Sequence, residues 1–274
     1  MNIQEITNLL VNAGIPENEA KIEIKLLMEH FFNFTEKDKL LGKTINDEQL
    51  NLLKQKVEYR ISERIPVQHI IGEAYFMGNY FKVNPDVLIP RDETEILVSE
   101  VIKIIKNNNF KTVLDIGTGS GCIACTIAKN TNATALGVDI SSDALRIALD
   151  NVTKLGINNR AVFRKSDLFD KIHSDEKFDI IVSNPPYIPF GTKLDPEVMK
   201  EPHIALFAND DGLSFYKKII TDAPNFLNKK GYIAFELGIN ESEKVKELLS
   251  RDFENIYIIK DFANIDRVII ANLK

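Results

Sequence analysis

From residue 110 onward, short apolar runs alternate with helical stretches, and this alternation limits the possible folds more than any other feature. Helical stretches are expected between the first six runs, which is typical of a doubly wound, mainly parallel sheet. The last two runs are joined by a loop too short for a crossover helix, so they should pair antiparallel. The sequence therefore predicts an α/β fold whose seven-stranded sheet ends in an antiparallel hairpin, with strands at 110–116, 133–140, 161–165, 178–182, 231–237, 255–260 and 267–272.

The first 72 residues carry helical periodicity and few strand signals. Helix starts are expected near Pro16 and Asp47. The Gly78-Asn79 pair lies between two aromatic runs, a pattern that predicts a β-hairpin. A helix from about Thr94 to Lys106 should follow. We therefore expect three parts: a small helical domain at 1–72, a hairpin linker at 73–92, and the sheet domain at 93–274.

The composition is that of an ordinary globular protein, with 44% hydrophobic and 27% charged residues. The net charge of −6 argues against a protein that grips nucleic acid mainly through phosphates. There is no apolar run long enough for a membrane span and no signal-peptide pattern, and two cysteines do not make a disulfide framework. We expect a cytoplasmic monomer with no membrane partner and no stable nucleic-acid partner.

A glycine-rich segment, DIGTGSG, stands where the first predicted strand should turn into a helix. Its glycines allow a tight turn and a close approach of a ligand to the backbone. Twenty residues past Gly119, Asp139 ends the second strand, where a carboxylate can accept both hydroxyl protons of a ribose. A glycine turn alone is a weak signal, but the strand, helix and acid in register predict a nucleoside-containing ligand. The candidate cofactor-binding residues here are Asp115, Gly117, Thr118, Gly119, Ser120, Gly121 and Asp139.

The spacing of the glycines separates two kinds of nucleoside ligand. It is G-x-G-x-G rather than the G-x-G-x-x-G of dinucleotide sites. Asp115 would repel a pyrophosphate but suits the cationic amino-acid end of S-adenosylmethionine; it could instead simply cap the loop. After the third strand, Asp167 could accept from an adenine amino group while Leu168 packs on the ring, although a helix cap or turn is the alternative.

The fourth predicted strand ends abruptly in Ser183-Asn184-Pro185-Pro186-Tyr187, because proline has no N–H to give a sheet. The Asn184 amide oxygen and the Pro185 carbonyl are two acceptors that can hold a planar –NH2 group, and Tyr187 can stack on it. If the electrophile is a sulfonium methyl, no strong base is needed before attack, and positioning supplies much of the rate. The alternative is an Asn-Pro turn without function.

Taken together, these motifs resemble the class I methyltransferases that modify exocyclic or amide nitrogens. The rest of the chain is most similar to the PrmC/HemK family of release factor glutamine methyltransferases. The similarity covers essentially the whole chain and rests also on Gly72-Glu73 with Tyr75-Phe76, 88–95 (LIPRDETE), Glu201-Pro202, Ala205-Leu206, Asp211-Gly212, 235–238 (FELG) and Asp266-Arg267-Val268.

The resemblance implies methyl transfer from S-adenosylmethionine to the glutamine amide (N5) in the Gly-Gly-Gln loop of class 1 peptide chain release factors, with S-adenosylhomocysteine as product. It implies a substrate-recognition role for the helical domain, catalytic roles for Asn184, Pro185 and Tyr187, and substrate contacts for these and Pro186. Asp167, Leu168 and Asn184 join the cofactor residues. Many relatives have an aromatic residue at Leu168, which bears on affinity, and this chain lacks the family's usual proline after Arg91.

Alternative roles for two residues and alternative functions for the chain stay open at this point. Arg91 could meet acids of the protein substrate or an internal acid, and Glu236 could be a base or structural. The runner-up function is methylation of adenine N6 or guanine N2 in nucleic acid, and a third is a ligand-sensing scaffold. The histidines show no metal spacing, so no metal is expected. Cys122 and Cys125 are read as small residues for helix packing.

Overall fold

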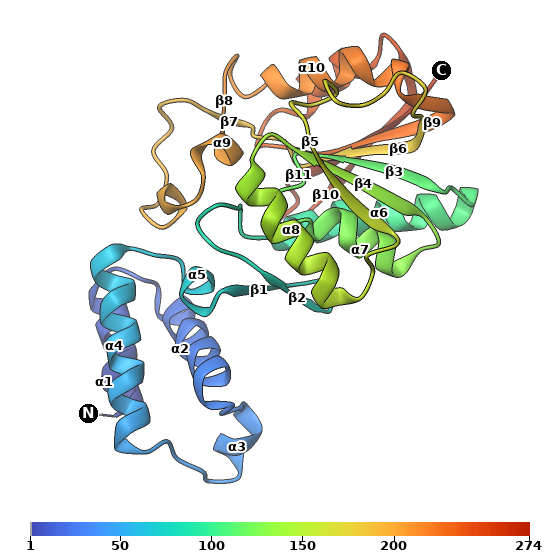
Figure 1. The fold of residues 1–274 in the computed structure, drawn as a ribbon. Helices are drawn as coiled ribbons and strands as arrows, with labels where there is room; N and C mark the ends of the chain where they lie inside the picture. Colours follow the sequence, from blue (N-terminus) through green and yellow to red (C-terminus); the bar gives the residue numbers. More distant parts are fainter. Residues whose placement is uncertain (1) are drawn as a thin grey trace. The chain divides into compact units, whose positions relative to one another are not determined.

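The computed structural model describes residues 2–274, which form two compact units (Figure 1). The helical unit extends to Glu73 and also takes in Leu194–Lys200. The sheet unit comprises Ala74–Lys193 and Glu201–Lys274. The chain therefore leaves the sheet unit for seven residues and returns to it. None of the described helices is long and apolar enough to cross a membrane.

The helical unit contains α1 (Ile3–Asn12), α2 (Glu17–Phe32), α3 (Glu36–Leu40), α4 (Asp47–Glu63) and α5 (Val67–Ile71). Capping boxes at Asn2, Thr35 and Asn46 satisfy the first N–H groups of α1, α3 and α4. Helices α1, α2 and α4 pack on one another, and fully buried Leu10 and Leu53 lie in their shared core. This small core stabilises the unit.

A buried ion network lies inside the helical unit. Arg60 of α4 is only 4% exposed and binds Glu23 of α2 through Nε and a terminal nitrogen. Its other terminal nitrogen lies 2.7 Å from Glu197, which belongs to the 194–200 segment. Arg64 reaches the same carboxylate at 2.8 Å. These contacts hold the 194–200 segment in the helical unit.

The sheet unit contains a seven-stranded sheet with the order β10-β11-β9-β6-β3-β4-β5. Strand β11 pairs antiparallel with both β9 and β10, and all other neighbours are parallel. The predicted seven-stranded α/β sheet with a terminal antiparallel hairpin is confirmed. The strands are β3 (Thr112–Ile116), β4 (Thr134–Asp139), β5 (Ala161–Lys165), β6 (Phe178–Ser183), β9 (Leu227–Glu236), β10 (Phe253–Lys260) and β11 (Asp266–Leu273).

Helices cover both faces of this sheet, because successive strand residues point to opposite sides. Val113 belongs to the core shared with α6 (Asp92–Asn108), α7 (Cys122–Asn130) and α8 (Ser142–Leu155). Leu114 belongs to the opposite core, shared with α10 (Ser214–Asp222) and α11 (Ser242–Leu249). Both faces of the sheet are buried, which explains why the strands appear in the sequence as continuous apolar runs. Cys122 and Cys125 are buried free thiols in the first of these cores.

One expected helix is missing. The prediction of a helical stretch between the third and fourth strands is wrong, because residues 166–177 form turns between β5 and β6. This segment carries turn-forming and charged residues without a continuous apolar face. Ser166 stabilises the turn: its Oγ donates to the Leu168 carbonyl at 2.8 Å and accepts from the Lys171 N–H at 3.0 Å.

The predicted hairpin is present as β1 (Glu73–Phe76) and β2 (Asn79–Lys82), but its turn lies one residue earlier than expected. Met77 and Gly78 both have positive φ angles, 46° and 79°, which is the geometry of a type I′ turn. Asn79 begins β2, and its side-chain amide donates to the Met77 carbonyl. Short elements complete the sheet unit: β7 (Ile188–Pro189), α9 (His203–Leu206), β8 (Phe207–Ala208) and η2 (Ala223–Asn225). The 194–200 segment holds η1 (Val198–Lys200).

Candidate active site

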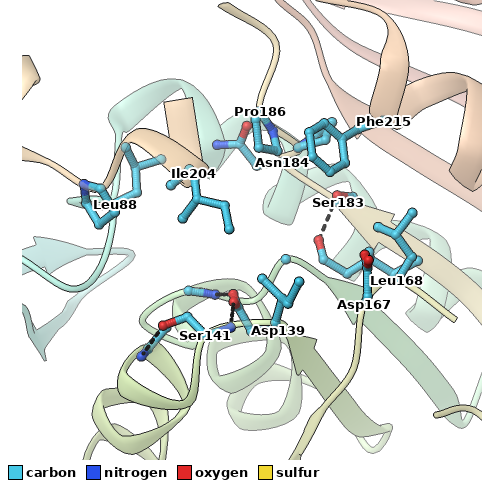
Figure 2. A pocket seen from close by; sticks show the side chains of 18 of the residues that line it. Leu88, Asp139, Ser141, Asp167, Leu168, Ser183, Asn184, Pro186, Ile204 and Phe215 are labelled. Atoms are coloured by element: carbon cyan, nitrogen blue, oxygen red, sulfur yellow. Dashed lines mark hydrogen bonds between the residues drawn. The ribbon is translucent and has the colours of Figure 1, made fainter. Parts of the chain in front are cut away.

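A pocket of about 220 Å³ opens at the carboxyl edge of the parallel strands (Figure 2). Loops that follow β3, β4, β5 and β6 all contribute to its lining, as expected for ligand sites in open α/β sheets. Of the predicted site residues, Gly117, Gly119, Asp139, Asp167, Leu168, Asn184, Pro185 and Pro186 line it. Asp115, Thr118, Ser120, Gly121 and Tyr187 do not belong to that lining.

The glycine loop presents an open backbone surface to the pocket. Gly117 and Gly119 have φ angles of +71° and +53°, and a Cβ atom added at either position would meet no heavy atom within 4 Å. Gly121 differs, because its Cβ would lie 2.8 Å from the Phe163 ring. The first two glycines thus leave room for a ligand, whereas the third allows close packing of helix on strand.

Asp115 lies beneath the glycine loop and is fully buried. Its Oδ2 accepts from the Thr118 hydroxyl at 2.6 Å and from the Ala124 N–H at 3.2 Å. Its Oδ1 is buried and has no hydrogen-bond partner among the described residues. Burial raises the pKa of this carboxyl to about 7. Asp115 therefore fixes the shape of the loop and leaves one oxygen without a partner among the described residues.

Asp139 ends β4 and faces the pocket (Figure 2). Its two oxygens accept from the Gly119 N–H at 2.9 Å and from the Ser141 N–H at 2.8 Å. Each carboxylate oxygen has more than one lone pair, so both can accept a further hydrogen bond from a ligand. Burial raises the pKa of this carboxyl as well. The side chain is thus held in place as a two-oxygen acceptor.

The wall after β5 combines an acid with an apolar side chain. Asp167 and Leu168 lie on the same side of the pocket (Figure 2). Leu168 has a φ angle of +46°, which is uncommon for a residue other than glycine, and the hydrogen bonds of Ser166 stabilise this turn. Ile116 and Phe215 add apolar lining. A flat, apolar ring with an amino group fits these surroundings.

The loop after β6 brings Asn184 to the pocket's edge, beside Pro186 (Figure 2). The preceding Ser183 is buried, and its hydroxyl donates to the Ile116 carbonyl at 2.7 Å, which holds the strand end in register. The Asn184 side-chain nitrogen lies 3.3 Å from the Thr94 hydroxyl of α6. Tyr187 turns inward, and its hydroxyl donates to Glu236 at 3.1 Å.

Thr94 and Asn151 support the site without having been assigned a role from the sequence, and for Arg91 the structure decides between the two partners that the sequence left open. Thr94 contacts Asn184, and the buried Asn151 joins the hairpin to the glycine loop by donating to the carbonyls of Lys82 and Ser120. Arg91 pairs with the buried Glu201, so its partner is an internal acid. Glu201 also accepts from the Ile89 N–H at 2.8 Å. No local sequence pattern marks these long-range contacts.

Two family models match this chain. One describes a methyltransferase domain and matches residues 107–265, and the other describes the PrmC N-terminal domain and matches residues 2–72. Among solved structures, a methyltransferase from Pyrococcus furiosus superposes with a TM-score of 0.54 at 19% identity, covering 80% of this chain and 96% of that one. The 16S rRNA N2 G1207 methyltransferase of T. thermophilus superposes with a TM-score of 0.55 at 18% identity, covering 74% and 50%. These identities support the fold alone.

The strand order, the glycine loop and the matched domain define a class I methyltransferase. Release factor glutamine methyltransferases are 41% identical in Clostridium acetobutylicum, over 81% of this chain and 80% of the relative, and 39% identical in Bacillus subtilis, over 97% and 94%. A relative of that name from Fusobacterium nucleatum is 40% identical over 84% of this chain, which spans 66% of the relative's length. The chain therefore belongs to the family of release factor glutamine methyltransferases.

Proposed function

We propose that this protein transfers a methyl group from S-adenosylmethionine to the side-chain amide nitrogen of the glutamine in the Gly-Gly-Gln motif of class 1 release factors. One observation carries the chemistry: Asn184 and Pro185 lie at the edge of a pocket whose other walls suit a nucleoside. A glutamine amide and a methyl donor would meet at this edge. The curated relatives support the choice of substrate.

The residues of the pocket fit the methyl donor. Asp139 accepts from the ribose hydroxyls, Asp167 accepts from the adenine amino group, and Leu168 packs on the ring. The open backbone at Gly117 and Gly119 accommodates the amino-acid end, and the unpartnered Oδ1 of Asp115 beneath the loop offsets its positive charge. When bound, the donor supplies an electrophilic sulfonium methyl group.

Asn184 and Pro185 act on the substrate amide. The Asn184 Oδ1 and the Pro185 carbonyl each accept one N–H of the glutamine –NH2 group, which fixes its plane and directs one face of the nitrogen at the methyl group. With the donor bound, transfer would form the nitrogen–carbon bond as the carbon–sulfur bond breaks, releasing S-adenosylhomocysteine, and the extra proton would pass from nitrogen to solvent. Pro186 lines the pocket beside the amide, and Tyr187 supports the loop from within through its hydrogen bond to Glu236. Positioning supplies the rate, so no strong base is required before attack.

We further propose that the protein is a cytoplasmic monomer and that its helical domain, residues 1–72, recognises the release factor. This domain has a groove lined by Lys21, Lys25, Lys39 and Lys43. Charge reversal at Lys25 and Lys39 together is expected to raise KM for the release factor and leave KM for S-adenosylmethionine unchanged. Unchanged KM values for both substrates would show that this groove does not bind the release factor.

The function is tested by mass spectrometry of a release factor incubated with the protein and S-adenosylmethionine. A gain of one methyl group on the Gly-Gly-Gln glutamine is the expected result. Methyl groups on adenine or guanine of a nucleic-acid control, with none on the release factor, would overturn the proposed substrate and keep the amine chemistry. No transfer to either would point to a scaffold.

Asp139→Ala is expected to weaken S-adenosylmethionine binding by about 10- to 100-fold, because each hydrogen bond to a charged acceptor contributes roughly 1.5–3 kcal/mol. Calorimetric titration measures the change. Asp150→Ala is the matched control, since Asp150 is exposed and pairs with Lys82 on the surface. Equal affinities of the two variants for S-adenosylmethionine would show that Asp139 does not bind the ribose.

A further inference from the structure

We propose that Thr94 and Glu236 are positioning residues. Together they fix the orientation of the Asn184 side-chain amide, that is, whether its oxygen or its nitrogen points toward the substrate. The inference rests on the proposed function, in which the Asn184 oxygen must accept from the substrate. The side-chain amide of asparagine ends in two groups of similar shape: a carbonyl oxygen, which accepts hydrogen bonds, and an –NH2 group, which donates them. Only one of the two orientations can accept a hydrogen bond from another amide nitrogen.

Glu236 ends β9, and its side chain is enclosed by donors. It is 1% exposed; its Oε2 accepts from the Thr94 hydroxyl at 2.5 Å, and its Oε1 accepts from the Tyr187 hydroxyl at 3.1 Å. Its own backbone carbonyl accepts from the Tyr216 hydroxyl at 2.8 Å. Thr94 is 2% exposed, so water does not compete for its hydroxyl. Glu236, Thr94 and Tyr187 thus hold one another through hydrogen bonds between side chains.

The direction of each hydrogen bond follows from the number of protons available. An ionised carboxylate only accepts, and a threonine hydroxyl has a single proton. Since Thr94 gives that proton to Glu236, its oxygen has only lone pairs to offer Asn184, 3.3 Å away. The Asn184 –NH2 group must therefore face Thr94, and Oδ1 must face away from it. The Asn184 oxygen is left for the substrate.

The same logic explains why a carboxylate is needed at this buried position. Burial raises the pKa of Glu236 to about 7, because burial disfavours the ionised carboxylate. Only the ionised carboxylate, however, accepts hydrogen bonds without donating any. A glutamine at this place could donate to Thr94, and the Thr94 hydroxyl could then donate to the Asn184 oxygen. The amide would face the substrate with its –NH2 group. Glu236 thus acts through Thr94, without touching either substrate.

The decisive comparison is Thr94→Val against Thr94→Ser at about pH 8, above the Glu236 pKa. Valine keeps the volume and loses the hydroxyl, so kcat should fall by about 10- to 100-fold with little change in KM for S-adenosylmethionine. Serine keeps the hydroxyl and should retain most of the wild-type kcat. A Thr94→Val enzyme with wild-type kcat overturns the proposal, as does equal loss in both variants.

A double-mutant cycle tests whether Glu236 acts through Thr94. Glu236→Gln removes a buried charge and should fold at least as stably as the wild type above pH 7, because a raised pKa means that the ionised form opposes folding there. Its kcat should fall like that of Thr94→Val, and the double variant should be no slower than either single one. Fully additive losses would mean that the two residues act separately, and would overturn the linkage.

A measurement without substrate separates this inference from the proposed function. In a 15N-labelled protein, the Asn184 –NH2 resonance is identified by its loss in Asn184→Ala. Its protons should exchange with water faster in Thr94→Val than in the wild type, because the hydrogen bond is gone. If the wild type fails to methylate release factors, the proposed function falls, and this exchange rate still decides the positioning: equal rates in both proteins overturn it.

Discussion

Replacing Asn184 with alanine is expected to lower the rate of methyl transfer by about 10²–10³-fold, comparable to removing a preorganised hydrogen-bonding group from an active site. The alanine keeps the pocket walls at Asp139, Asp167 and Leu168 and removes only the acceptor at the edge. The substrate amide then rotates freely, and its nitrogen lone pair seldom points at the methyl group. Affinity for S-adenosylmethionine should stay nearly unchanged.

Single-turnover transfer to a release factor measures the loss in rate, and calorimetry measures cofactor affinity. The matched control is Asn107→Ala on the exposed side of α6, which should leave both values at those of the wild type. If Asn184→Ala transfers methyl at the normal rate, the amide pocket described for Asn184 and Pro185 is wrong. A large loss of cofactor affinity would instead place Asn184 mainly in the cofactor site.

Replacing Arg60 with methionine is expected to lower the free energy of unfolding of the helical unit by about 3–5 kcal/mol. Arg60 lies within 2.9 Å of Glu23 and 2.7 Å of Glu197, and methionine would leave both carboxylates facing a largely buried space without their shared cation. Methionine fills much of the volume, so the loss reports on charge rather than on a cavity. Hydrogen exchange of α2 and α4 measures the effect in this unit.

Two controls make the result specific to the buried cation. Arg146→Met removes an exposed arginine paired with Asp143 and should cost about 1 kcal/mol or less. Adding Glu23→Gln to Arg60→Met should recover part of the stability, since the carboxylate left unpaired is then gone, whereas Glu197 keeps Arg64 as a partner. Unchanged protection of α2 and α4 in Arg60→Met would show that the ion network contributes nothing.

The sheet, its antiparallel end and the pocket-lining loops could all be predicted because each has a local signal. Both faces of the strands are buried, so they appear as short apolar runs. Gly119, Asp139 and Asn184 follow such runs directly, and parallel strands bring their carboxyl ends to one edge. The helix wrongly expected at 166–177 shows the limit of this reasoning, since the alternation of strands and helices was extended to a segment that forms turns.

The sequence by itself determined the class of fold, the edge of the sheet that carries the pocket, and the residue types at that edge. Only the tertiary structure decided their partners: Thr94 meets Glu236 across 142 positions, Arg91 meets Glu201 across 110, and Arg60 meets Glu197 across 137. The physical reason is that strands and glycine turns follow from periodicity over a few residues, whereas a pairing between distant side chains depends on how whole elements pack.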